Sequence, residues 1–160
     1  TVIQDLKYPV RVTYAGRLDR ESEGLLLMTN DGNLINGLMR AANFHEKEYV
    51  VKVDKELTEQ FIEDMAAGVY LTELEKTTRP CKVEYIGKYT FRIILTQGLN
   101  RQIRRMCKEL GYQVKQLRRI RIANIELGKL KPREYRRLTK KELEMLYSKV
   151  RNQEDEAELK

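Results

Sequence analysis

Apolar residues along this chain form short runs and alternations, which turn residues separate from one another. Residues 24–29 are an apolar run followed by Asn30-Asp31-Gly32, the pattern of a buried strand closed by a tight turn. Further strands are predicted at residues 49–53, 82–86, 90–96 and 114–127. In the last of these the doublet Arg118-Arg119 breaks the alternation and indicates a β-bulge.

Four other segments have helical spacing, and most carry a start or stop signal. We predict helices at residues 33–42, 58–68, 101–110 and from 139 onward. Thr58 is an N-cap candidate, and Gly68 and Gly111 end the second and third helices. Thr139-Lys140-Lys141-Glu142 is a capping box at the start of the fourth.

Strand segments outnumber helices and often adjoin one another along the chain. We therefore predict an α+β fold with a mixed, mainly antiparallel sheet and flanking helices. Residues 1–152 are expected to form one domain, and residues 153–160 an acidic, disordered tail.

Composition excludes several classes of protein. The chain has 160 residues, 41% of them hydrophobic and 34% charged, which is ordinary for a globular protein. It contains no run of 18 apolar residues, so we expect no membrane span. Cys81, Cys107 and the single His45 cannot supply a four-ligand zinc site, and we expect two free thiols in a reducing cytosol.

The net charge of +7 is concentrated in one strip, residues 101–121. The strip holds eight lysine and arginine residues against a single acid, Glu109. A basic strip on an otherwise neutral chain is typical of a protein that binds a polyanion, although a basic helix face facing solvent would look the same.

Three residues are candidates for chemistry. Asp19 lies in the loop before the first buried strand, where an aspartate taken alone is usually a cap or turn residue. On a helical wheel Arg104 lies at the edge of the buried face, where it can meet a carboxylate, whereas Arg101, Arg105 and Lys108 lie behind it and can meet phosphates. Tyr49, at the mouth of a strand, can stack on a base or serve as a half-buried structural tyrosine.

Three motifs, in this order and spacing, resemble the RsuA-type ribosomal RNA pseudouridine synthases. They are Gly16-Arg17-Leu18-Asp19 with Ser22-Glu23-Gly24-Leu25, His45-Glu46-Lys47-Glu48-Tyr49, and Gln97-Gly98-Leu99-Asn100-Arg101-Gln102-Ile103-Arg104-Arg105-Met106. The resemblance covers residues 8–150 and is greatest to the RluF branch, which modifies large-subunit RNA.

The resemblance implies a catalytic role for Asp19, Tyr49 and Arg104. Asp19 would be the nucleophile, Tyr49 would pack against the target base, and Arg104 would pair with Asp19. The substrate-binding residues that it implies are Arg17, Lys47, Arg101, Gln102, Arg105 and Leu117. Arg17 would help displace the target base and Leu117 would line the pocket.

The same resemblance implies a bent, mostly antiparallel sheet with a central RNA cleft, and neither cofactor nor metal. The expected partner is ribosomal RNA, in particular a stem-loop of the large-subunit RNA. We expect a monomeric, cytoplasmic enzyme that does not associate with a membrane. Family members usually carry an S4-type RNA-binding domain and a Lys-Pro segment ahead of the Gly-Arg-Leu-Asp loop. This chain starts after both, so we expect an N-terminally incomplete catalytic domain.

Two rival functions fit part of the pattern. A non-catalytic RNA-binding domain explains the basic strip but has no need of Asp19, Tyr49 and Arg104 together. A hydrolase with an aspartate nucleophile and a small-molecule substrate leaves the basic strip unexplained.

Overall fold

The computed structural model describes residues 13–14, 18, 21–40 and 45–159. The strands are β1 (Thr13–Tyr14), β2 (Glu23–Gly24), β3 (Met28–Thr29), β4 (Lys47–Val53), β5 (Tyr70–Leu71), β6 (Lys76–Thr77), β7 (Lys82–Gly87), β8 (Thr90–Leu95), β9 (Val114–Ile122) and β10 (Ile125–Glu126). The helices are α2 (Gly32–Arg40), α3 (Glu59–Ala67), α4 (Gln102–Glu109) and α5 (Lys140–Leu159).

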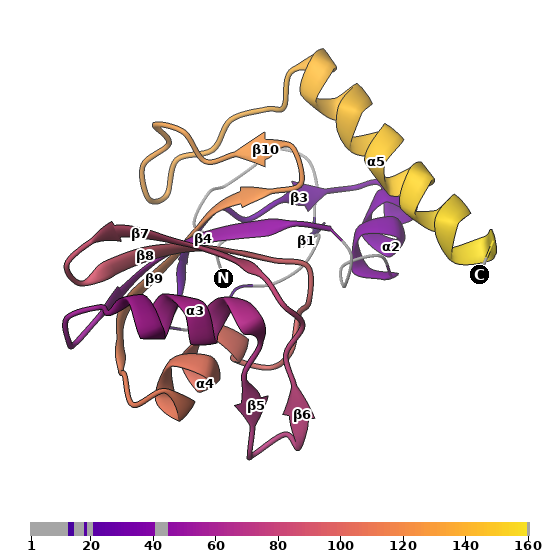
Figure 1. The fold of residues 1–160 in the computed structure, drawn as a ribbon. Coiled ribbons are helices and arrows are strands. Elements are labelled where there is room, and N and C mark those ends of the chain that lie inside the picture. The colour runs from indigo at the N-terminus through magenta and orange to yellow at the C-terminus, as the bar shows by residue number, and fades with distance from the viewer. Residues whose placement is uncertain (1–12, 15–17, 19–20, 41–44, 160) are drawn as a thin grey trace.

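The centre of the molecule is a mixed sheet. Its strands follow the order β10-β9-β4-β8-β7, every neighbouring pair antiparallel, and β2 pairs with β9 in parallel. Helices α3 and α4 lie below the sheet in Figure 1. Helices α2 and α5 pack against each other to the upper right of the sheet. The predicted α+β class, with a mainly antiparallel sheet and flanking helices, is confirmed.

The larger core lies between the sheet and the helices α3 and α4. Phe91, Ile93 and Leu95 on β8 are buried, as their alternation predicted, and they pack with Phe61 and Met65 of α3. Helix α3 begins where predicted, because the Thr58 hydroxyl accepts a hydrogen bond of 3.0 Å from the Phe61 amide.

A second core joins α2 and α5 to the β9–β10 hairpin. It is built from Leu34, Leu38, Ile125, Leu146 and Val150, together with Leu25 and Leu27 of the segment between β2 and β3 and with Ile122 and Ala123 of the hairpin. The predicted capping box starts α5: the Glu142 amide donates to the Thr139 hydroxyl at 3.1 Å, and the Thr139 amide donates to the Glu142 carboxylate at 2.9 Å.

The structure differs from the sequence prediction in several elements. The predicted strand 114–127 is two antiparallel strands, β9 and β10, joined by a turn at residues 123–124, and the two-residue strands β1, β5 and β6 were not predicted. The apolar run 24–29 is divided between β2 and β3, because Gly24 turns with a φ of 114° and the chain leaves β9 there. Residues 153–159 continue α5 where a disordered tail was expected, since glutamate, alanine and leucine favour helix and no glycine or proline interrupts them. In the described part of the chain, no helix has the length and apolar character needed to cross a membrane.

Candidate active site

A cavity of about 220 Å³ opens where β4, β8 and β9 meet the start of α4. Its lining comes from segments far apart in the sequence: Leu18, Ser22, Lys47, Tyr49, Leu95, Gln97, Gly98, Leu99, Asn100, Arg101, Gln102, Ile103, Leu117 and Arg119. Five of the predicted site residues, Lys47, Tyr49, Arg101, Gln102 and Leu117, are therefore brought together. Arg17 and Asp19 lie outside the described residues, although Leu18 between them lines the cavity.

Strand β4 contributes Lys47 and Tyr49 to one wall. The two residues are two positions apart, so they point to the same side of the strand. Tyr49 is half-buried against the main core and keeps part of its ring toward the cavity. Burial, together with the charge of Arg119, lowers the pKa of the Lys47 ammonium. The wall thus combines an aromatic ring with a cation that loses part of its hydration.

Strand β9 supplies the floor, through Leu117 and a residue that the sequence analysis missed. Arg119 lies opposite Tyr49 in the β4–β9 register and is 3% exposed. Its Nε and Nη2 both donate to the Leu25 carbonyl, at 2.9 and 2.7 Å, and the Leu25 amide donates to the Arg119 carbonyl at 2.8 Å. Arg119 therefore fixes the chain that follows the Asp19 loop onto the sheet.

The bulge predicted at Arg118-Arg119 lies beside this residue. The β4–β9 register shifts between Glu48 and Tyr49, whose partners on β9 are Arg121 and Arg119, leaving Ile120 unpaired in that ladder. Beyond a bulge, residues that would have faced one side of the sheet face the other, so simple alternation does not show which way Arg119 points. In the sequence, the one indication that Arg119 is buried was its place in the doublet that breaks the alternation.

The loop before α4 forms the opposite wall. Arg101 takes a left-handed conformation with a φ of 49° at the start of the helix. Gln102 is buried and organises this loop: its Oε1 accepts from the Leu99 amide at 3.1 Å, and its Nε2 donates to Gln97 Oε1 at 3.4 Å. The polar atoms of Gln102 are hydrogen-bonded within the loop, so Gln102 stabilises this wall of the cavity and is not placed to bind substrate directly.

Arg104 reaches the chain next to Asp19. Its Nη2 donates to the Glu21 carbonyl at 3.0 Å, and its Nη1 lies 3.8 Å from the Glu21 carboxylate. The Arg104 side chain is 15% exposed, as expected for a residue at the edge of the buried face. The predicted pairing of Arg104 with Asp19 falls partly on residues outside the described ones and stays a prediction.

Most cations of the basic strip 101–121 are engaged within the protein. Arg105 contacts Glu73 and both oxygens of Asn100, and Lys108 lies 3.1 Å from Glu73. Arg101 pairs with Glu21 at 3.1 Å, and Arg121 pairs with Glu46 and Glu48 at 3.2 and 3.0 Å. Arg105 does not line the cavity. Acidic partners from distant segments, invisible in the local charge count, thus neutralise much of this strip.

The other candidates for chemistry do not form a competing site. Burial raises the pKa of the Cys81 thiol to about 11 and that of Cys107 to about 12, and both cysteines are free, as predicted. Within residues 13–14, 18, 21–40 and 45–159, no three histidine, cysteine or acidic side chains gather as metal ligands would. A larger hollow of about 440 Å³ lies beside Arg136, but Arg136 is already held by Glu142 at 2.8 Å.

Replacing Arg104 by alanine should lower any turnover at this cavity by about 100-fold, because the Glu21 carbonyl, two residues after Asp19, loses its anchor. The rate under single-turnover conditions is the measurement. Arg151→Ala removes an arginine from the exposed surface of α5, far from the cavity, and should react as the unmodified chain does. Equal rates for both variants would remove Arg104 from the site.

Comparisons with a family model and with curated proteins point to the same family. Residues 2–109 match the family model described as RNA pseudouridylate synthase. The chain is 46% identical over 159 residues to "Dual-specificity RNA pseudouridine synthase RluF" of Escherichia coli (strain K12), covering 99% of this chain and 54% of that protein. It is 36% identical over 137 residues to "Uncharacterized RNA pseudouridine synthase YtzG" of Bacillus subtilis (strain 168), covering 82% of this chain and 57% of that protein.

A solved structure agrees with these relatives. The crystal structure of a pseudouridylate synthase superposes with a TM-score of 0.85 at 32% identity, covering 91% of this chain and 65% of that one. The chain spans about half the length of the curated relatives that it matches.

Proposed function

The chain belongs to the RNA pseudouridylate synthase family, and we propose that it isomerises a uridine in ribosomal RNA to pseudouridine with Asp19 as nucleophile. One observation carries the proposal: the cavity gathers Lys47, Tyr49, Leu117 and Leu18, the residue directly before Asp19. Its volume of about 220 Å³ is below the 300–1,000 Å³ typical of drug-sized ligands, which suits a single extruded base.

The reaction is a redox-neutral rearrangement. The bond between C1′ and N1 breaks, the uracil rotates, and a bond forms between C1′ and C5. The hydrogen at C5 leaves as a proton and N1 acquires one, so the atoms balance. The Asp19 carboxylate acts as a nucleophile at C6 or at C1′, or as a base that abstracts a proton at C2′.

The neighbouring side chains have separate tasks in this proposal. Tyr49 stacks on the target base and offsets part of the few kcal/mol that base extrusion costs, while Leu117 packs against it. Lys47 and Arg101 meet the phosphates or polar edges of the target nucleotide. Arg17 helps to displace the base, Gln102 supports the wall, and Arg105 braces the loop through Asn100.

The substrate in this proposal is a stem-loop of large-subunit ribosomal RNA. The Escherichia coli relative is named a dual-specificity RNA pseudouridine synthase, which supports RNA as the class of substrate. Residues 1–152 act as the catalytic domain of a monomeric, cytoplasmic enzyme without cofactor or metal.

Release of tritium tests the function directly. RNA transcribed with uridine carrying tritium at C5 should lose label to water when incubated with the chain, since C5 gives up its hydrogen on isomerisation. The substrate is a transcript of large-subunit ribosomal RNA, which carries no earlier modification because it is made in vitro, and chain heated to unfolding is the control. Tight RNA binding without tritium release would favour the non-catalytic RNA-binding domain instead.

A further inference from the structure

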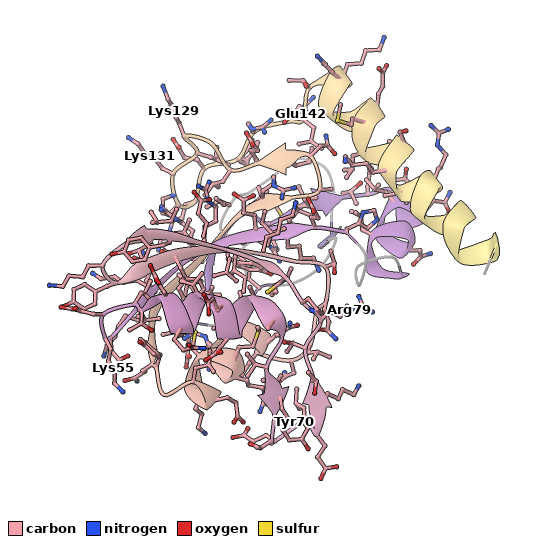
Figure 2. All side chains as sticks on the ribbon, viewed as in Figure 1. Lys55, Tyr70, Arg79, Lys129, Lys131 and Glu142 are labelled. Carbon is pink, nitrogen blue, oxygen red and sulfur yellow. The ribbon has the colours of Figure 1, made fainter. Side chains whose placement is uncertain are left out.

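A second basic surface lies in the β10–α5 loop, residues 127–139, and the first residues of α5. Residues 129–141 hold seven lysine and arginine residues and one acid, Glu134. Residues 131–137 are all exposed. Figure 2 shows Lys129 and Lys131 pointing outward from this loop, away from the body of the molecule.

These cations lack the acidic partners that neutralise the strip 101–121. Arg136 is held by Glu142, but within the described part of the chain no carboxylate lies within 4.0 Å of the other six. They are Lys129, Lys131, Arg133, Arg137, Lys140 and Lys141. The one acid of the loop is occupied, because Glu134 accepts a hydrogen bond of 2.7 Å from the Lys131 amide.

The loop nevertheless has a defined shape. Arg136 ties it to the start of α5 through Glu142 and to β10 through the Glu126 carbonyl, at 3.3 Å. The Glu134 amide donates to the Lys131 carbonyl at 3.0 Å and closes a turn. A loop whose backbone is already ordered loses less conformational freedom when it binds a ligand, so this loop can present several cations together at a smaller entropic cost.

The loop begins close to the cavity, on the same sheet. The Leu127 amide donates to the Ile120 carbonyl at 2.8 Å, next to Arg119 in the floor. Lys47, Ile122 and Ile125 lie in one row across β4, β9 and β10, so about 10 Å of sheet separates Lys47 from the strand that leads into the loop. The acidic run 154–158 lies at the opposite end of α5, about 20 Å along the helix from Lys140 (Figure 1).

From this charge, exposure and position we propose that the β10–α5 loop is a second contact for the RNA backbone, binding phosphates of the nucleotides that flank the target uridine. The inference rests on the proposed function for its substrate. Phosphate oxygens are the ligand that matches a row of uncompensated lysine and arginine side chains, and such contacts position an RNA without reading its bases.

The test is the salt dependence of RNA binding. The loop variant carries Lys129→Gln, Lys131→Gln and Arg133→Gln, and leaves Arg136, which shapes the loop, in place. The matched control carries Lys52→Gln, Lys76→Gln and Lys82→Gln, three exposed lysines that do not line the cavity. Binding of a fluorescently labelled large-subunit stem-loop with flanking helix is measured by anisotropy from 50 to 200 mM KCl, with melting temperatures to verify folding.

Each phosphate contact contributes about 0.7 to 0.9 to the slope of log K against log salt, so the loop variant should flatten it by about 2 to 3. Its KM should rise with kcat unchanged, because the loop does not touch the reacting base. The control triple should bind with the slope of the unmodified chain.

A loop variant with the wild-type slope and affinity would overturn the inference, even if tritium release proceeds normally. Loss of binding to polyglutamate with RNA binding intact would assign the surface to an acidic protein and also overturn it. A chain that releases no tritium but whose loop variant shows the flattened slope would sink the isomerase proposal alone.

Discussion

Replacing Asp19 by asparagine should abolish the release of tritium from C5 of uridine. The amide has the size of the carboxylate but lacks its charge and its nucleophilicity. The variant therefore has no group that can attack the nucleotide or abstract a proton from it. Loss of a residue at the centre of an enzymatic reaction costs on the order of 10⁴- to 10⁶-fold in kcat. The measurement is tritium release under single-turnover conditions, with enzyme in excess over RNA.

RNA affinity separates this loss from a loss of binding. Asp19→Asn should bind the stem-loop at least as tightly as the unmodified chain, because removing a negative charge beside an RNA site reduces repulsion. Asp64→Asn is the matched control, since Asp64 is exposed on α3, does not line the cavity, and is bonded only to Gln60 among the hydrogen bonds of the described residues. Substantial turnover by Asp19→Asn would falsify the assignment of the nucleophile.

Replacing Gly24 by alanine should damage both stability and rate. Gly24 has a φ of 114°, and a Cβ there would lie 2.2 Å from the Arg119 carbonyl oxygen and 2.5 Å from its amide nitrogen. Both atoms are main chain in the middle of β9, so they cannot move aside as a flexible side chain would. Strain at such a residue and the overlap together should cost roughly 3 kcal/mol.

The expected readouts follow from the position of Gly24. For a domain of this size a loss of 3 kcal/mol corresponds to a fall in Tm of roughly 6–12 °C. Displacing β2 from β9 also breaks the hydrogen bonds between Arg119 and Leu25, and it moves the loop that carries Asp19 and Ser22. A displacement of about 1 Å at that loop should lower the rate by about 100-fold at temperatures where the variant is folded.

Gly87→Ala is the control for the effect of an added methyl group. Gly87 lies at the end of β7 in a conformation open to any residue, and no atom would lie within 4 Å of a Cβ there. Its Tm and rate should stay near those of the unmodified chain. If Gly24→Ala melted and reacted as Gly87→Ala does, the close approach of β2 to β9 would have no role in holding the site.

The sequence and the structure differ on where the positive charge available to bind RNA lies. The strip 101–121 predicted a basic track for RNA, yet Glu21, Glu46, Glu48 and Glu73 reach it from other segments and pair with its arginines. In residues 129–141, Arg136 pairs with Glu142, but among the described residues no carboxylate lies within 4.0 Å of the other six cations, whose charge the sequence count had balanced against acids elsewhere. Charge pairing depends on spatial neighbours, so a sum along the chain could not locate the free positive charge.

Local signals in the sequence were enough to predict several features correctly. Thr58 and Gly68 bound α3, Thr139 and Glu142 start α5, and the alternation of Phe91, Ile93 and Leu95 identifies the buried face of β8, because each signal involves residues within a few positions. The order and spacing of the three motifs also pointed to the family before any contact was known. For Asp19 and Arg17, which lie outside the described residues, the motif remains the basis of the assignment.

The way in which these elements pack together depends on contacts between residues far apart in the chain. The apolar run after Asp19 read as one strand, but Gly24 divides it because β9 passes within contact distance of its backbone. Arg119 read as one basic residue among eight, yet it is buried in the cavity floor and holds the Leu25 carbonyl. Both outcomes depend on a partner about 95 positions away in the chain, and local propensity carries no information about contacts that only the folded sheet creates.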